Sequence, residues 1–313
     1  EKRREMVKRS VAAITDISQN SILKDSSRNA FMIKRMEDLA DRTIWAMGEQ
    51  LKCGDFVPFV FEHKFNMEVG DGDRKQLMSG TIDRVDICEN GTDVYVRIID
   101  YKTGKKDFNI VKTYYGIDIQ LMVYMEAAMK LVAKMRPGKN VIPAGVFYYN
   151  ISDPVVSATT ESAEEIEDKI KGELRLKGMV NSDKDIVEKM DNNEGTSLNI
   201  PVSSKADGGF DSRRSKVMNT EQFNMLGRFV DVRAVDTADR IAGGDIRRSP
   251  YKDGQFSSCD RCPYGAVCGF SVDLPGCNYR KLKKFDDEVL WNNIKEAVDE
   301  NGKKMDTGAE ECD

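Results

Sequence analysis

The feature that most constrains this chain is the order of apolar patterns in its first half. Residues 26–52 carry apolar side chains at helical spacing. Three strand-like runs follow between residues 56 and 104, and the turn dipeptide Asn90-Gly91 joins the last two into a predicted hairpin. Residues 114–135 return to helical spacing, and residues 142–151 form another strand-like run. The order helix, three strands, helix, strand predicts a mixed α/β fold.

The second half of the chain is more polar. Residues 160–193 are highly charged and weakly patterned, a polar loop follows, and a helix is expected at about 220–241. A cysteine-rich loop and a last helix at about 286–300 complete the chain. We therefore predict four parts, which are an N-terminal helical segment (1–55), a core (56–152), a charged helical insertion (153–240), and a cysteine loop with a C-terminal helix (241–313).

Composition excludes several classes of protein. Hydrophobic residues make up 40% and charged residues 32% of the chain, which excludes a disordered or collagen-like protein. No apolar run approaches the roughly 18 residues that a membrane span requires, so no membrane association is expected. The chain begins at Glu1 without a signal peptide, and we interpret it as a fragment of a larger protein. Clustered cysteines indicate a reducing cytosol, and a single histidine, His63, excludes most histidine-based catalysis.

The strongest chemical signal is a pair of acidic strand ends. Asp83 interrupts one predicted strand and Asp100 interrupts the next. If the turn pairs these strands, both carboxylates lie at one end of the sheet, where they repel each other unless a cation lies between them. Hard oxygen ligands suit Mg²⁺ or Mn²⁺. Lys102 shares the sheet face of Asp100, so its ammonium group can hold a water or stabilise phosphate charge. The alternative is that all three are ordinary solvated residues.

Gln120 and Tyr124 follow on the next predicted helix. Their spacing of four residues places both side chains on one helix face. Alone, such a pair is more often part of a helix surface than a DNA contact. Here it completes an ordered series, G-x-I-D, then D-Y-K, then Q-x-x-x-Y.

This series resembles the RecB-like branch of the PD-(D/E)XK nucleases. The segments that carry the resemblance are SGTIDRVD (79–86), IIDYKTG (98–104), YYGIDIQLMVYMEAA (114–128) and GVFYYNI (145–151). The resemblance implies a restriction-endonuclease-like core, in which helices flank a mixed central sheet. It also implies an activity, the metal-dependent hydrolysis of DNA phosphodiesters.

The same resemblance implies roles for individual residues. Asp83, Asp100 and the carbonyl of Tyr101 would bind the divalent cation, and Lys102 would be the catalytic lysine. Gln120 and Tyr124 would support the active site and the DNA strand. Glu62 matches an acidic residue that often precedes these motifs in the family, and its alternative is a solvated strand residue.

A second signal is the cysteine triplet in CDRCPYGAVCGF. Cys259, Cys262 and Cys268 lie close enough in sequence to bind one soft metal centre, and Cys277 could supply a fourth ligand to zinc. The loop also resembles the C-terminal part of AddB-type helicase–nuclease subunits. That resemblance implies that the three cysteines join a distant upstream cysteine to bind a structural [4Fe-4S] cluster.

Two features of that family do not occur in this sequence. The upstream cysteine and a metal-binding histidine normally precede the motif strands. Cys53 lacks the expected context and is interpreted as a buried structural thiol, while His63 is expected to point away from the face of Glu62. We therefore expect the fragment to hold metal and cluster poorly, with the [4Fe-4S] cluster belonging to the full-length protein.

Net charge argues against a nucleic-acid enzyme, because the chain carries a formal charge of −5. Positive charge is concentrated locally at Lys102, Lys105, Lys106 and Lys112, although such a run is commonly just a solvated face. The leading hypothesis is a DNA exonuclease domain of an AddAB/RecBCD-like complex in the bacterial cytosol. It would process double-strand breaks for recombinational repair, with an AddA-like helicase–nuclease subunit as partner. The alternatives are a catalytically idle DNA-end-binding scaffold and a stand-alone RecB-like exonuclease.

Overall fold

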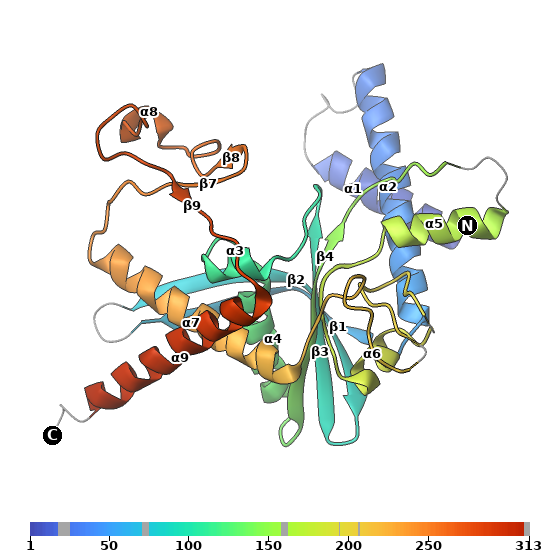
Figure 1. Cartoon of the computed structure of the whole chain (residues 1–313). Coiled ribbons are helices and arrows are strands. Elements are labelled where there is room, and N and C mark those ends of the chain that lie inside the picture. Colours follow the sequence, from blue (N-terminus) through green and yellow to red (C-terminus); the bar gives the residue numbers. More distant parts are fainter. Residues whose placement is uncertain (18–25, 71–74, 158–161, 194, 206, 310–313) are drawn as a thin grey trace. The chain divides into compact units, whose positions relative to one another are not determined.

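A computed structural model describes residues 1–17, 26–70, 75–157, 162–193, 195–205 and 207–309 (Figure 1). The chain divides into two compact units. The first contains Glu1–Phe65, Gly80–Phe108 and Tyr124–Phe223, and the second contains Asn66–Ser79, Asn109–Val123 and Asn224–Asp313. Each unit is described separately below.

Six strands form one mixed sheet among the described residues, in the spatial order β1 to β6 (Figure 1). Their bounds are β1 Val57–Val69, β2 Gln76–Asn90, β3 Asp93–Lys102, β4 Asn140–Asn150, β5 Lys177–Asn181 and β6 Val217–Met218. Strands β2 and β3 are antiparallel, β3 and β4 parallel, β4 and β5 antiparallel, and β5 and β6 parallel. The predicted hairpin is confirmed, with Gly91 at φ +59° in its turn. The expected mixed sheet flanked by helices is likewise confirmed.

One face of the sheet in the first unit packs against α2 (Ser27–Lys52), the helix predicted over residues 26–52. The side chain of Ser26 caps the helix by accepting a hydrogen bond from the amide of Asn29. The core on this side includes Ala46 of α2 and strand residues of alternating position, among them Cys88, Tyr95, Ile99, Phe147 and Tyr149. A further helix, α1 (Lys2–Ile17), packs on α2 and was not predicted.

The helix predicted over residues 114–135 is divided in two. A short helix, α3 (Ile110–Tyr114), ends before Gly116, which adopts φ +74°, and α4 (Gln120–Met135) begins afterwards. The hydroxyl of Thr113 donates a hydrogen bond to the carbonyl of Asp118 at 2.9 Å, which closes the intervening turn. The prediction was wrong at this point, because apolar spacing continued across a turn that a glycine and side-chain hydrogen bonding define.

The sheet continues past residue 152, where we expected the core to end. The charged segment forms α5 (Ala163–Glu173) and α6 (Lys184–Met190), but it also supplies β5 and β6. Buried Asn181 secures β5, because its side-chain amide donates hydrogen bonds to the carbonyl of Pro143 at 2.7 Å and to the hydroxyl of Thr220 at 2.8 Å. The strands escaped prediction because they are too short to show a period.

The second unit contains most of α7 (Thr220–Ala242), α9 (Asp287–Ala309) and a small sheet. The sheet consists of β7 (Tyr251–Asp253), β8 (Phe256–Ser257) and β9 (Arg280–Lys281), with the one-turn helix α8 (Gly265–Cys268) beside it in sequence. Tyr114 stacks on Phe229 with ring centres 5.5 Å apart and contacts Phe285 edge-on at 5.4 Å. The helices predicted near 220–241 and 286–300 are confirmed. No helix in the described part of the chain is long and apolar enough to cross a membrane.

Candidate functional site

Asp83 and Asp100 lie where the β2–β3 hairpin stops pairing. The last residue pair of the ladder is Arg84 with Ile99. Beyond it, the carboxylate of Asp83 accepts a hydrogen bond from the backbone amide of Tyr101 at 2.7 Å. A side chain thus replaces the strand–strand contact immediately next to Asp100. The two aspartates meet at one end of the sheet, as the turn and strand lengths predicted.

Asp100 is buried, with 2% of its surface exposed, and forms an ion pair with the ammonium group of Lys102. Strand alternation explains this contact, because residues two apart share a face. Burial raises the pKa of the Asp100 carboxyl, the hydrogen bond and charge of Lys102 oppose that rise, and the neighbouring charge of Asp83 adds to it. A second cation close to these two carboxylates would therefore be stabilising.

The donor set fits a divalent cation of the hard type. Two adjacent carboxylates provide anionic oxygen, and Mg²⁺ and Mn²⁺ prefer such ligands over nitrogen or sulfur. Within the part of the chain that the structure describes, no three His, Cys, Asp or Glu side chains form a metal-binding group. The carboxylate pair needs backbone oxygen or water to complete a coordination sphere, which is how Mg²⁺ is usually bound.

Tyr101 places its side chain on the opposite face of the sheet from Asp100. Its hydroxyl accepts a hydrogen bond from Arg84 at 3.5 Å, and Arg84 in turn donates to buried Asp86 at 2.6 and 2.8 Å. Arg97 donates to the same carboxylate at 2.9 Å. A buried Arg–Asp–Arg cluster therefore lies behind the strand end that carries the carboxylate pair.

Tyr124 and Gln120 fall in different units. The ring of Tyr124 contacts Phe65 edge-on, with ring centres 5.7 Å apart. Both rings lie against Gly80, where a Cβ atom would approach Phe65 to 2.8 Å and Tyr124 to 3.3 Å. The glycine of the G-x-I-D motif is therefore required for this packing. Gln120 is the first residue of α4 and belongs to the second unit, whereas Asp83, Asp100, Lys102 and Tyr124 belong to the first.

The remaining residues singled out near the motifs lie on or before β1. Glu62 is exposed and adopts φ +49°, a left-handed conformation that is unusual for a residue with a side chain. His63 is half-buried. Cys53 follows α2, and its thiol donates a hydrogen bond to the carbonyl of Glu49 at 3.3 Å. The expectation that Cys53 is buried was wrong, because the helix end leaves it half-exposed.

The cysteine triplet lies in the second unit, around α8. Cys259 and Cys268 are half-buried, Cys262 is exposed and Cys277 is buried. The backbone turns back between the first two, where the amide of Cys262 donates to the carbonyl of Cys259 at 3.1 Å. Among the residues described, these thiols do not converge into a ligand group. Their arrangement therefore does not fit a bound cluster.

Three residues beside the carboxylate pair were not predicted as site residues. Lys106 and Lys102 both place their ammonium groups over the ring of buried Tyr148, and Asn150 makes two hydrogen bonds to the backbone of Lys106. The sequence indicated Lys106 only as part of a basic run. Nothing in the spacing of Tyr148 and Asn150 signals their contacts, which depend on the parallel pairing of β3 with β4.

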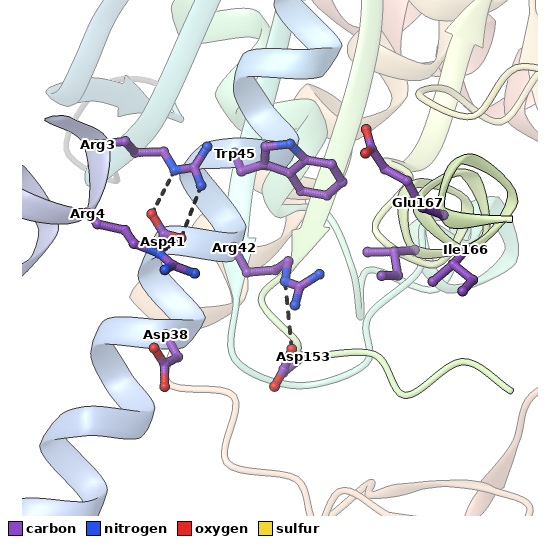
Figure 2. Close-up of a pocket in the computed structure, with 11 residues that line it drawn as sticks. Arg3, Arg4, Asp38, Asp41, Arg42, Trp45, Asp153, Ile166 and Glu167 are labelled. Carbon is purple, nitrogen blue, oxygen red and sulfur yellow. Dashed lines mark hydrogen bonds and ion pairs between the residues drawn. The ribbon is translucent and has the colours of Figure 1, made fainter. Parts of the chain in front are cut away.

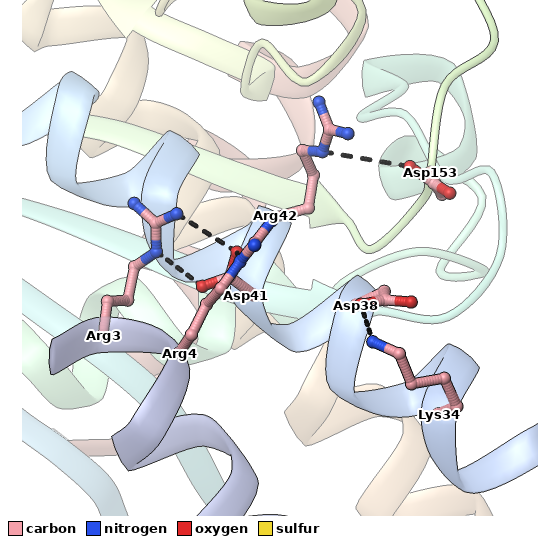
Figure 3. Close-up of polar contacts among 7 residues, drawn as sticks. All are labelled: Arg3, Arg4, Lys34, Asp38, Asp41, Arg42 and Asp153. Carbon is pink, nitrogen blue, oxygen red and sulfur yellow. Dashed lines mark hydrogen bonds and ion pairs between the residues drawn. The ribbon is translucent and has the colours of Figure 1, made fainter. Parts of the chain in front are cut away.

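A separate pocket of about 530 Å³ lies among α1, α2 and α5 (Figure 2). Arg3 donates two hydrogen bonds to Asp41, at 2.7 and 3.1 Å, and Arg42 lies 3.9 Å from Asp153 (Figure 3). The hydrogen bond from Arg3 lowers the pKa of Asp41, with a smaller contribution from Arg4. Its basic groups are thus matched by acidic ones, and the pocket resembles a polar junction between helices more than a catalytic site.

The fold and the strand-end carboxylates define a class of protein. The sequence matches the PD-(D/E)XK nuclease superfamily over residues 1–269, and the chain belongs to that family.

Several relatives narrow this further. The chain is 34% identical over 296 residues to an ATP-dependent helicase/deoxyribonuclease subunit of the AddB type from Thermoanaerobacter sp. (strain X514), an alignment that covers 91% of this chain and 25% of that protein. The corresponding proteins from Lachnoclostridium phytofermentans and Caldanaerobacter subterraneus subsp. tengcongensis are 36% and 35% identical, over 93% and 97% of this chain and 26% and 27% of their own lengths. The chain therefore spans about a quarter of the length of the curated relatives it matches.

Proposed function

We propose that this chain is a divalent-metal-dependent DNA nuclease module that hydrolyses phosphodiester bonds at the Asp83–Asp100 site. The observation that carries the proposal is the convergence of two carboxylates and Lys102 where the β2–β3 ladder ends, in a chain of the PD-(D/E)XK nuclease superfamily. The same residue types, spread over the surface, would support no such activity.

The residues have distinct roles in this proposal. Asp83 and Asp100, with the carbonyl of Tyr101, would hold Mg²⁺ or Mn²⁺. When bound, such a cation supplies a Lewis acid for the phosphate and makes water more acidic. Lys102 then stabilises the negative charge that develops on the phosphate and orients the attacking water. Tyr124 would support the site through its packing on Phe65, and Gln120 would contact the DNA strand.

The relatives suggest where this module works. Their name describes a subunit of an ATP-dependent helicase and deoxyribonuclease. We propose that the module serves a helicase–nuclease complex of the AddAB/RecBCD kind, together with an AddA-like subunit, in the processing of DNA double-strand breaks in the bacterial cytosol. A [4Fe-4S] cluster at Cys259, Cys262 and Cys268 stays a prediction for the full-length protein, and iron and sulfide analysis of anaerobically purified protein tests it.

The test is cleavage of end-labelled single- and double-stranded DNA with Mg²⁺ or Mn²⁺. We expect Asp100→Ala to reduce the cleavage rate by at least about a thousandfold, which corresponds to about 4 kcal/mol of transition-state stabilisation. The matched control is Asp93→Asn, because Asp93 lies at the opposite end of the same strand. It should cleave at the wild-type rate.

Undiminished cleavage by Asp100→Ala would overturn the assignment of the site. Binding of DNA ends without cleavage under either metal, by protein that is folded and carries iron, would favour a scaffold with an idle site. The first result concerns the residues and the second concerns the activity, so the two outcomes are separable.

A further inference from the structure

The loop that follows β3 is fixed to the end of β4 at one residue, Lys106. The backbone amide of Lys106 donates a hydrogen bond to Oδ1 of Asn150 at 3.0 Å, and Nδ2 of Asn150 donates to the carbonyl of Lys106 at 2.9 Å. Phe108, two residues further on, is buried and anchors the loop. The position of Lys106 is therefore set by the sheet, whereas its neighbour Lys105 is fully on the surface.

Lys106 extends toward the same ring as Lys102. The ammonium nitrogens lie 5.7 Å (Lys102) and 5.6 Å (Lys106) from the ring centre of Tyr148. Tyr148 is fully buried and pairs directly with Asp100 across the β3–β4 ladder. The charge of Lys106 is also felt at Asp100, where it opposes the rise of the pKa that burial causes. Lys106 is thus part of the surroundings of the carboxylate pair.

A third lysine continues this row across the sheet. Lys177 of β5 pairs with Tyr148 of β4, so Asp100, Tyr148 and Lys177 occupy successive strands at one level (Figure 1). Directly paired residues point to the same face, and two strand spacings amount to about 10 Å. Lys177 is half-buried, and burial together with the nearby charge of Arg175 lowers its pKa.

Charge then decides which ligand this row would attract. Without a metal, Lys102 is paired with Asp100. When a divalent cation joins the two carboxylates, the cation, Lys102 and Lys106 exceed the carboxylates by two positive charges. Such an excess on a sheet face favours polyanions, and ammonium groups on buried stems are common phosphate ligands.

We propose that Lys106, held by Asn150 above Tyr148, binds a backbone phosphate next to the scissile one and, together with Lys177, guides a DNA strand across β3, β4 and β5. This inference rests on the proposed nuclease function and names a substrate contact for the same site. The nearby acidic Asp107 is paired with Lys216, so it does not cancel Lys106. The contact recognises the sugar–phosphate backbone and is independent of base sequence.

The test measures binding and cleavage separately, using the full chain and a labelled single-stranded oligonucleotide. Binding is followed by fluorescence anisotropy with Ca²⁺ in place of Mg²⁺. We expect Lys106→Gln to weaken binding about tenfold, and to reduce the slope of log K against log salt by about 0.7. Cleavage in Mg²⁺ should show a raised KM and a kcat within about threefold of wild type. Lys105→Gln removes the same charge one residue away and should change affinity less than twofold.

A second measurement identifies the phosphate itself. Oligonucleotides with one uncharged methylphosphonate linkage, moved one position at a time, should bind the wild type more weakly at one position near the cleaved bond. Lys106→Gln should be insensitive at that position, because the partner charge is already gone. Asn150→Ala should produce part of the Lys106→Gln effect and add nothing to it.

The outcomes distinguish this inference from the proposed function. If the wild type cleaves DNA but Lys106→Gln and Lys105→Gln behave alike, the phosphate site is wrong and the nuclease stands. If the wild type fails to cleave but the methylphosphonate coupling to Lys106 is present, the phosphate site stands on a DNA-binding module. Coupling to Lys105 instead would overturn the role of Asn150 in positioning the contact.

Discussion

Asp86 and Asp100 lie on neighbouring strands and are almost equally buried, with 0% and 2% of their surfaces exposed, yet their surroundings differ in kind. Asp86 accepts hydrogen bonds from two guanidinium groups, those of Arg84 at 2.6 Å and Arg97 at 2.9 Å. Asp100 is paired with the ammonium group of Lys102 and has a second carboxylate beside it. One carboxylate is enclosed by fixed cations and the other is next to a like charge.

This difference separates a structural acid from a candidate ligand. The two arginines come from β2 and β3 and satisfy Asp86 within the sheet, so a metal would gain nothing there. At Asp100 the like charge of Asp83 is costly, and a divalent cation would relieve it. Burial alone therefore does not identify the site, because both acids are buried. The sign of the neighbouring charges does.

The largest effect on stability should come from removing Asp86. Asp86→Ala leaves Arg84 and Arg97 buried without their carboxylate, and burial already works to lower the pKa of Arg97 while Asp86 opposes it. We expect the free energy of unfolding to fall by about 3–5 kcal/mol. Urea denaturation followed by tryptophan fluorescence and circular dichroism measures this change.

A triple variant controls for the loss of volume. Arg84→Met with Asp86→Leu and Arg97→Met removes all three charges together and should unfold within about 1 kcal/mol of the wild type. If Asp86→Ala alone were as stable as the wild type, the cluster would not be a closed ionic unit, and the contrast with Asp100 would fail.

Asp100→Asn should act in the opposite direction. The substitution removes a buried charge next to Asp83, and Lys102, whose side chain is 30% exposed, can turn to water. We expect the free energy of unfolding to stay unchanged or to rise by up to about 1 kcal/mol in metal-free buffer, while DNA cleavage is lost. A loss of stability similar to that of Asp86→Ala would show that Asp100 is a structural acid as well.

The sequence predicted the part of the fold that local signals encode. The Asn90-Gly91 turn and the apolar runs on either side of it define the hairpin and bring Asp83 and Asp100 to one sheet end. The helix α2 was also predicted closely, because a capping serine at Ser26 and regular apolar spacing define it locally. Family motifs, and not burial or charge, distinguished Asp83 from Asp86 in the sequence.

Contacts made across strands could not be predicted in this way. The placement of Lys106 depends on Asn150, which is 44 residues away in the chain and reaches it only through the parallel pairing of β3 and β4. Strands β5 and β6 are short and join the sheet after long connections. The triplet Cys259, Cys262 and Cys268 has the spacing of a ligand group, but spacing does not specify how a loop orients its thiols.

The comparison of the two acids extends to Asp41, a carboxylate on the helical surface whose partners are more exposed. Arg3, with 41% of its side chain exposed, donates two hydrogen bonds to Asp41, and Arg4 donates one (Figure 3). The pKa of Asp41 is lowered from its ordinary value of 3.8, chiefly by the hydrogen bond from Arg3. A folded-state pKa below the unfolded one stabilises the fold above the unfolded pKa, and this stabilisation is lost as pH falls through the folded pKa.

Asp41→Asn should therefore have the smallest effect and the clearest dependence on pH. We expect it to lower the free energy of unfolding by about 0.5–1 kcal/mol at neutral pH, a difference that stays constant above about pH 5 and shrinks below it. Salt at about 1 M should also reduce the difference, because the pair is partly exposed. Urea denaturation of wild type and variant from about pH 7 to about pH 4 measures both effects, and Asp38→Asn, which removes an exposed pair with Lys34, is the matched control. A difference that persists unchanged at low pH would mean that Asp41 contributes through packing, and the charge-based contrast between the acids would not extend to the helical surface.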